Sequence, residues 1–365
     1  MRSGRSSAKR SRSYAVDICG TCALVGSVVE IVMNASKVTA EDYIQFTIAS
    51  PKVFSATEAA RVSTAMPRPP AHDGYTRLLT RLEPDSEALW AETQPLIRRE
   101  EGVLVLDDST LDKPYARFMP LVGTHWSGKH HRVVRGINLV TALWTDGSAL
   151  YPCDYRVYRK TVDQKTKNDH FRDMLDVAAK RGMKPNYVLF DTWYASLENL
   201  KHIRSMGWKF LTRLKSNRLV SVDRGAARAL AEQAITAAGT VVWLPGYGEL
   251  KVFRIVATNG DTFHWATNDL ELTPVRQEEL AGWSWNIEEF HRGLKQHTGV
   301  ERCAVRRIRG QLNHIGLSIR AFVRLEYHRM KSGISWFQAK TEICREAVRK
   351  YLLNPLFQLP NTSTA

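Results

Sequence analysis

Cysteine is scarce in this chain of 365 residues. The five cysteines are scattered along it: Cys19, Cys22, Cys153, Cys303 and Cys344. So few cysteines exclude a small secreted scaffold held by disulfides and favour a reducing, cytoplasmic setting. Cys19 and Cys22 form a CxxC pair, but no second pair follows that would complete a zinc site. We therefore interpret this pair as incidental.

Long hydrophobic runs are also missing. The apolar stretch from Ile18 to Val29 is too short to cross a membrane. Its acidic flanks, Asp17 and Glu30, are unlike those of a signal peptide. We expect no membrane partner. A cleaner start with a helix-capping pattern opens at Met33, so we interpret residues 1–32 as an N-terminal extension that is disordered or comes from a misassigned start.

Acidic residues are in deficit, with 37 Asp and Glu against 52 Lys and Arg, which gives a formal charge of +15. A folded protein with such an excess usually neutralises a polyanion, and phosphate is the commonest one. The alternative is a basic surface that is merely solvated. The charge balance therefore favours nucleic-acid binding without indicating any chemistry.

Residues 33–100 predict a helical region. Apolar residues recur at helical spacing over 40–49, 56–63, 75–82 and 86–98. The arginines of this region (Arg77, Arg81, Arg98 and Arg99) suit a DNA-binding head. A helical cap on the next domain explains the pattern equally well, so both interpretations stay open.

The pattern changes to α/β over residues 101–216. Buried strands are predicted at 103–106 and 187–190, with further strands at 133–144, 149–158 and 208–214 and helices at 168–181 and 196–206. The predicted order is three strands, a helix, a strand, a helix and a strand, which is the order of an RNase H-like core. We expect a β-rich insertion over 217–282, the second part of the core over 283–331, and a helical tail over 332–365.

Two of the predicted strands end in aspartate, at Asp107-Asp108 and at Asp191. Carboxylates at neighbouring strand ends converge at one sheet edge, where they can hold divalent cations. A third carboxylate on a nearby helix would complete a site for two Mg²⁺ ions that promotes phosphoryl transfer. Aspartates at strand ends also serve as turn formers. Either Asp107 or Asp108 can be the first ligand, because neighbouring strand residues face opposite sides.

A predicted helix over 283–297 offers the third carboxylate. Ile287, Phe290 and Leu294 form one apolar stripe, and Glu288, Arg292 and Lys295 form a charged stripe beside it. Glu289 points elsewhere and is the weaker candidate. The simplest alternative is a solvated charged face.

Three segments together resemble a known family. Ile287-Glu-Glu-Phe-His-Arg-x-x-Lys295, followed by Gly299-Val-Glu301, is similar to the catalytic signature of bacterial insertion-sequence transposases of the DDE type, in the branch with a Tyr-x2-Arg-x3-Glu-x6-Lys motif. Asp191-Thr-Trp-Tyr194 resembles the family's second-aspartate motif, and Leu106-Asp-Asp-Ser-Thr-Leu-Asp-Lys-Pro114 resembles its first. The resemblance runs over about residues 40–330.

The resemblance implies roles for these residues. Asp107 (or Asp108), Asp191 and Glu288 become the catalytic metal ligands, and Lys295 becomes a contact to the DNA end. It further implies two Mg²⁺ ions, for which Mn²⁺ can substitute, and cleavage at the terminal inverted repeats followed by strand transfer into target DNA. The implied protein is a homodimer on double-stranded DNA in the nucleoid of a bacterial cytoplasm. Two alternatives are an RNase H-like nuclease without strand transfer and a catalytically inactive DNA-binding descendant of a transposase.

The chain departs from the family pattern at two positions. Ala281 and Ser284 stand where the family has Tyr and Arg, which bears on how a hairpin would form. Trp285 matches a family aromatic, and Trp283 is a candidate stacking platform. Phe263 and Trp265 are candidates for a wedge in distorted DNA. Further expected DNA contacts are His291, Arg292, Lys129, Arg132 and Arg306, together with the other basic residues of the same segments: Arg302, Arg307, Arg309, Arg320, Arg324, His130 and His131.

Overall fold

The computed structural model describes residues 38–127 and 131–357. The predicted extension 1–32, with its CxxC pair, and the residues Lys129 and His130 lie outside the described residues. The helices are α1 (Ala40–Ala49), α2 (Ala56–Val62), α3 (His72–Arg81), α4 (Glu87–Thr93), α5 (Lys160–Asp163), α6 (Lys167–Lys180), α7 (Leu197–Ser205), α8 (Pro274–Ser284), α9 (Asn286–His297), α10 (Ile308–Ser332) and α11 (Trp336–Leu353). Short 3₁₀ helices are η1 (Gln94–Leu96), η2 (Thr192–Tyr194) and η3 (Leu230–Glu232).

The strands are β1 (Val103–Asp112), β2 (Gly123–Ser127), β3 (Arg132–Thr145), β4 (Tyr151–Tyr158), β5 (Tyr187–Phe190), β6 (Phe210–Leu214), β7 (Leu219–Val220), β8 (Arg228–Ala229), β9 (Thr240–Leu244), β10 (Gly248–Val256) and β11 (Thr262–Thr267). The predicted strands and helices of the core are present in the predicted order, and β2 and the short α5 are additional elements that were not predicted. Helix starts follow local chemistry: Thr39, Thr166 and Ser335 each cap a helix and form a reciprocal capping box with the residue three positions on.

One sheet of nine strands organises the molecule, in the order β2-β3-β1-β5-β6-β11-β10-β9, with β4 paired to β3. The strands β1, β5 and β6 run parallel to one another, whereas β3 is antiparallel to β1 and to β4. Strand β11 pairs antiparallel with β6. The β segments predicted between residues 217 and 282 therefore continue the central sheet through β9–β11, and only β7 and β8 form a separate small sheet.

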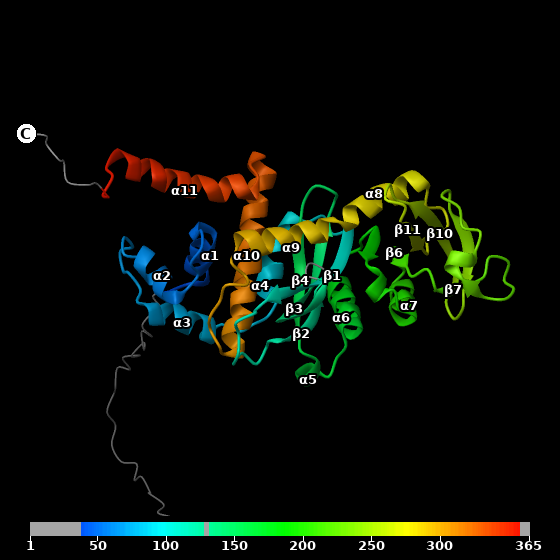
Figure 1. Ribbon diagram of the computed structural model, residues 1–365, viewed down its shortest axis with the longest axis horizontal. Coiled ribbons are helices and arrows are strands. Elements are labelled where there is room, and N and C mark those ends of the chain that lie inside the picture. The colour runs from blue at the N-terminus through cyan, green and yellow to red at the C-terminus, as the bar shows by residue number, and fades with distance from the viewer. Residues whose placement is uncertain (1–37, 128–130, 358–365) are drawn as a thin grey trace, which may run out of the picture. The chain divides into compact units, whose positions relative to one another are not determined.

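Helices cover both faces of the sheet (Figure 1), and an apolar layer lies under the helices on each face. On one face, α6 and α7 bury a layer that includes Phe171 and Leu200. On the other face, α8, α9 and α10 bury a layer that includes Leu280, Phe290 and Phe322. Burial of this apolar surface is the main stabilising contribution to the fold. The fold is thus a three-layer arrangement, with the sheet packed between two layers of helices.

The predicted single helix over 283–297 is two helices. Thr273 caps α8, and Pro274 occupies its first turn, where its missing N–H is harmless. The break comes at Trp285, and α9 then begins at Asn286. The last part of the expected β-rich insertion is therefore helical. Within α9, a Cβ atom at Gly293 would lie 2.8 Å from the rings of both Phe322 and Trp336, so glycine permits the close approach of α9 to α10 and α11.

The N-terminal helices pack against α10. Tyr43 and Leu78 share a buried layer with Leu317 of α10, and the Tyr43 hydroxyl lies 2.9 Å from Nδ1 of His314. This packing is what a helical cap requires, which supports the second of the two interpretations of this region. A role of these helices in DNA binding remains a prediction.

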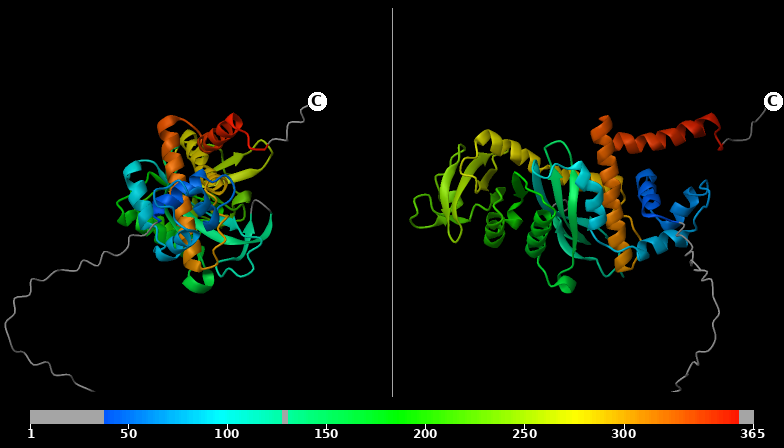
Figure 2. Two further views of the ribbon diagram at one scale, coloured as in Figure 1. Left: turned by 90° about the vertical axis from the view of Figure 1, so that its left-hand side faces the viewer. Right: turned by 180° about the vertical axis from the view of Figure 1, so that it is seen from behind.

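Helix α11 follows α10 after Gly333, whose φ of 72° is left-handed. Figure 2 shows α11 leaving the end of α10 and running away from the sheet. It is anchored by Trp336, whose indole N–H donates to the buried Glu326 carboxylate, and by Lys340, which donates to the Thr47 and His297 carbonyls. No helix within 38–127 or 131–357 combines the length and apolar character that a membrane span needs.

Candidate active site

Strand β1 carries its side chains alternately to the two faces of the sheet. Val103 and Val105 belong to the layer under α9, and Leu104 and Leu106 belong to the layer under α6. By the same alternation, Asp107 faces the α9 side and Asp108 faces the α6 side. The sequence predicted that β1 ends at these aspartates, but the strand continues to Asp112, because β3 pairs with it along its whole length.

Asp108 is fully engaged by neighbours on the α6 side. Its carboxylate accepts hydrogen bonds from Lys167 Nζ and Asn138 Nδ2, both at 2.7 Å, and from the Tyr194 hydroxyl at 2.8 Å. Burial acts to raise the pKa of Asp108, but the Lys167 charge and the hydrogen bonds outweigh it and lower the pKa. Asp108 is thus a compensated, buried anion.

Asp107 lies beside Asp191 because of the strand register. Leu106 of β1 pairs with Phe190 of β5 in parallel register, so the next residue on each strand is an aspartate at the same level. Leu189 of β5 belongs to the layer under α9, and alternation therefore places Asp191 on the α9 side, like Asp107. Strand β5 ends at Phe190 because Asp191 begins the 3₁₀ helix η2, whose Trp193 N–H donates to the Asp191 carboxylate at 2.9 Å.

Burial and neighbouring carboxylates raise the pKa of both aspartates. Burial raises the pKa of Asp107 well above its ordinary value, and the charges of Asp108, Asp191 and Glu288 raise it further. Burial also raises the pKa of Asp191, and the Asp108 charge raises it further, although the Trp193 and Tyr194 N–H groups and the Arg213 charge partly offset this shift. A concentration of buried negative charge of this kind attracts cations.

Helix α9 brings Glu288 to the same face. Ile287, Phe290 and Leu294 are buried as the periodicity predicted, and Glu288 lies in the first turn with an exposed side chain. The charge of Glu288 acts on Asp107, whereas that of Glu289 acts on Arg329. The Glu288 charge thus reaches an aspartate of the candidate site, whereas the Glu289 charge reaches α10.

The three carboxylates do not form a metal-binding cluster in the structure. Within residues 38–127 and 131–357, no three Asp, Glu, His or Cys side chains stand close enough together to hold a metal ion as they are. Asp107 and Asp191 are fixed by the sheet, whereas the exposed Glu288 side chain projects from a helix and has free rotamers. The arrangement of Glu288 is thus the adjustable part of the site.

The predicted DNA contacts on α9 separate into two groups. Arg292 is exposed, and Trp285 before the helix is 58% exposed. Lys295 is half-buried, with Nζ 2.9 Å from the Thr110 carbonyl. His291 is only 4% exposed, and its Nε2 lies 2.8 Å from the Thr141 hydroxyl. Burial lowers the pKa of His291 to about 3. A neutral histidine in the interior is not available to DNA, so His291 is excluded as a DNA contact.

The other predicted cations also divide by exposure. Arg132 and Arg306 are exposed at the surface. Arg320 and Arg324 instead form ion pairs with Glu92, and Arg309 forms one with Glu83. These three arginines of α10 therefore hold the N-terminal helices in place, and no local pattern indicates partners more than 200 positions away.

Two aromatic residues of the insertion pack against Arg213, which is not among the predicted DNA contacts. The Arg213 guanidinium lies over the rings of Phe263 and Trp265, 5.4 and 5.7 Å from their centroids. Trp265 is opposite Arg213 in the β11–β6 pairing. The wedge predicted from Phe263 and Trp265 is thus partly packed against this arginine. Trp283 is also partly packed, under the Arg276 guanidinium at 4.7 Å.

Comparisons with known proteins identify the region that carries these residues. Residues 98–323 match the sequence model of a family described as "Transposase DDE domain". Comparison with curated protein sequences finds no match. Among solved structures, the chain is similar to a piggyBac transposase in a synaptic complex with hairpin DNA, with 10% identity, a TM-score of 0.48, and coverage of 89% of this chain and 76% of that chain. A likeness this distant does not assign function.

Proposed function

The chain belongs to the family of transposases with a DDE domain, and we propose that it cleaves DNA at the ends of an insertion sequence and joins the freed 3′-hydroxyl to target DNA. The observation that carries the proposal is the level placement of Asp107 and Asp191 on the sheet face that α9 covers. Glu288 approaches this pair from the first turn of α9. These are three carboxylates from distant parts of the chain.

The residues present fit a divalent cation. Transposases of this family use divalent metal ions, and Asp107 is buried among like charges that nothing in its surroundings fully offsets. Oxygen ligands of this type suit Mg²⁺, with Mn²⁺ as a substitute. We assign Asp107, Asp191 and Glu288 as the ligands of two ions. When held by these carboxylates, the ions would supply activation of the attacking hydroxyl and stabilisation of the leaving oxygen.

Each ligand contributes differently because of where it stands. The sheet holds Asp107 and Asp191 at fixed spacing, which orients the reacting phosphate without a further loss of entropy. Glu288 completes the site by a change of rotamer once DNA and cations are present. Arg292 and Lys295, further along the same helix, hold the phosphates of the DNA end, and the exposed Trp285 contacts a base. Holding two ends together calls for a homodimer on the DNA.

The test compares Glu288→Gln with Glu289→Gln as a matched control. Both side chains are exposed on the first turn of α9, so both variants should fold normally. We expect Mg²⁺-dependent nicking of a duplex carrying the element's end to fall by about a hundredfold or more in Glu288→Gln and to persist in Glu289→Gln. Equal activity in both variants would remove the assignment of the active site.

Strand transfer needs a separate assay, because a nuclease of the same fold would pass the nicking test. The substrate is a pre-cut end with a free 3′-hydroxyl, mixed with a supercoiled plasmid as target. Joined products are expected, and they should disappear in Glu288→Gln. A protein that nicks the uncut end but never joins the pre-cut one is a nuclease, and one that does neither is an inactive DNA-binding descendant.

A further inference from the structure

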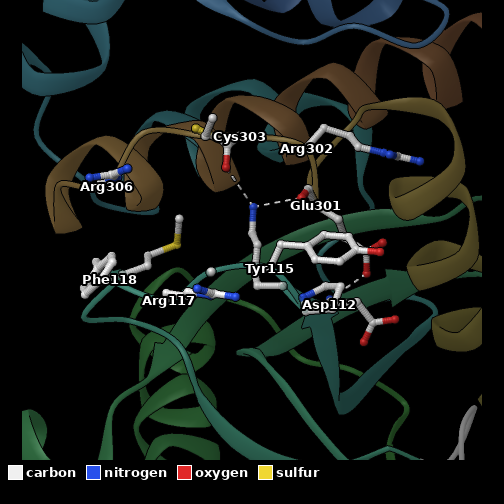
Figure 3. Close-up of a pocket in the computed structure, with 13 residues that line it drawn as sticks. Asp112, Tyr115, Arg117, Phe118, Glu301, Arg302, Cys303 and Arg306 are labelled. Atoms are coloured by element: carbon white, nitrogen blue, oxygen red, sulfur yellow. Dashed lines mark hydrogen bonds between the residues drawn. The ribbon is translucent and has the colours of Figure 1, made fainter.

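A pocket lies at the C-terminal end of β1, beyond the three carboxylates. This pocket of about 640 Å³ opens between residues 112–119, which follow β1, and residues 301–306, which follow α9 (Figure 3). Hydrogen bonds join the two segments. Lys113 Nζ donates to the Glu301 and Cys303 carbonyls, and the Glu301 carboxylate accepts from the Asp112 N–H at 2.9 Å. The pocket is therefore a fixed feature of the fold.

The rim of the pocket combines exposed aromatic rings with cations. Tyr115 is 93% exposed and Phe118 is 76% exposed. In Figure 3 these two rings and the Arg117 side chain come from one wall, and Arg302 and Arg306 come from the other. All three arginines are exposed, and no hydrogen bond or ion pair to the rest of the described chain engages their guanidinium groups.

This chemistry matches one class of ligand. Single exposed aromatics are common on proteins, but aromatic rings interleaved with arginines are typical of surfaces that bind unpaired nucleotides, because bases stack on the rings while phosphates meet the cations. Four basic side chains (Lys113, Arg117, Arg302 and Arg306) face two acidic ones (Asp112 and Glu301) at the pocket, and the Glu301 carboxylate is already occupied. The surplus charge is positive, which favours a polyanion over an apolar peptide.

The position of the pocket relates it to the carboxylates. Helix α9 and the segment after it follow β1 in the same direction: Glu288 acts on Asp107, Lys295 meets Thr110, and Glu301 meets Asp112. Asp112 is five residues beyond Asp107 on the same strand, a distance of about 17 Å at the rise of an extended strand. DNA covers about that distance in five nucleotides at ~3.4 Å each. Arg292 and Lys295 lie along this path.

We propose that the pocket formed by residues 112–119 and 301–306 binds an unpaired nucleotide of the DNA, about five positions from the phosphate that is cut. Tyr115 and Phe118 stack on the base, and Arg117, Arg302 and Arg306 hold its phosphates. This inference rests on the proposed function in taking DNA as the partner and the Asp107 side of the sheet as the place of cleavage, and it assigns the pocket no part in the chemical step.

The experiment measures the affinity of the full chain for a fully paired duplex and for a duplex of the same sequence with a short unpaired stretch. The unpaired duplex should bind more tightly. In Tyr115→Ala/Phe118→Ala this preference should fall by about tenfold or more. Tyr115→Phe, which keeps the ring, should retain the preference. Phe337→Ala and Arg345→Ala on α11 are the matched controls and should leave it unchanged, whereas Arg117→Ala should weaken it.

A scan with 2-aminopurine locates the nucleotide. Its fluorescence should change on binding when the probe lies about five positions from the cut, and this change should vanish in Tyr115→Ala/Phe118→Ala. If the double variant keeps the preference for unpaired DNA, the proposal is wrong. It is equally wrong if the double variant changes only the oligomeric state measured by sedimentation, because the pocket then binds protein.

The two proposals fail separately. Glu288→Gln should lose nicking while keeping the preference for unpaired DNA, since Glu288 is not in the pocket. Loss of that preference in wild-type protein that still nicks DNA would refute the pocket proposal alone. Persistent nicking in Glu288→Gln would refute the assignment of the active site and the spacing counted from it, but it would leave the binding of an unpaired nucleotide in the pocket standing.

Discussion

The Nζ atom of Lys167 lies 2.7 Å from Oδ2 of Asp108, so one of the two adjacent aspartates on β1 has a cation as a partner. Its neighbour Asp107 faces the opposite side of the sheet, and burial together with the charges of Asp108, Asp191 and Glu288 raises its pKa. The same pair of residues thus contains one carboxylate that stabilises the fold and one that the fold holds at an energetic cost. This difference leads to opposite predictions for their substitution.

Asp108→Asn should destabilise the protein. The change leaves the largely buried Lys167 ammonium without its counter-ion, which costs about 2 kcal/mol or more for a pair of this burial. Chemical denaturation measures the loss. The double variant Asp108→Asn/Lys167→Met should recover much of the stability, because no buried charge is left unpaired. A double variant as unstable as the single one would show that the ion pair is not the cause.

Asp107→Asn should raise the thermal stability in the presence of EDTA, because it removes a buried charge that its neighbours repel. Added Mg²⁺ should stabilise the wild type, since a cation that binds only the folded state shifts the unfolding equilibrium. It should not stabilise Asp107→Asn. Melting curves with and without Mg²⁺ test both statements, and a Mg²⁺ effect of the same size in the variant would contradict the assignment of Asp107 as a ligand.

Arg292→Ala should weaken binding to duplex DNA of any sequence. An exposed arginine that neutralises one phosphate releases about one counter-ion, so the slope of log affinity against log salt concentration should fall in magnitude by about one. Fluorescence anisotropy over a salt series measures this slope. Arg345→Ala on α11, which removes an equal charge, is the control. The same change of slope in both variants would indicate general electrostatics instead of a contact at Arg292.

His314 should make stability depend on pH. Burial lowers its pKa in the folded protein to about 3, against an ordinary value of 6.5. Below pH 6.5 the unfolded chain therefore binds a proton that the folded chain excludes, and stability falls by up to ~1.4 kcal/mol per pH unit as the pH decreases towards 3. The folded state keeps His314 neutral, with Nδ1 accepting from Tyr43 and Nε2–H donating to the Gly299 and Val300 carbonyls.

His314→Gln isolates this contribution, because other buried histidines act in the same direction. The variant will be less stable at neutral pH, since it disturbs buried hydrogen bonds, but its stability should fall less steeply with decreasing pH. The difference in slope from wild type should approach one proton between pH 4 and 6. Denaturation at a series of pH values measures it. Parallel curves would show that His314 is protonated in the folded protein.

Local patterns predicted most of the secondary structure. The alternation and the buried runs of residues 103–106 and 187–190 indicated strands, and the stripe of Ile287, Phe290 and Leu294 indicated the buried face of α9; both are confirmed. These signals are local because hydrophobic periodicity follows directly from the geometry of a strand or a helix. The break at Trp285 escaped the periodicity because helical spacing continues across it.

Which side of each element carries the candidate site depends on contacts between distant parts of the chain. Strand geometry alone makes Asp107 and Asp108 face opposite ways, since strand side chains alternate, but it does not specify which of the two faces α9 covers. The sequence likewise shows that the segment after α9 is basic, but not that Arg320 and Arg324 would meet Glu92, or that residues 115–118 would stand opposite residues 302–306. Such contacts join positions far apart in the chain, and their partners are set by packing and register, which no local pattern contains.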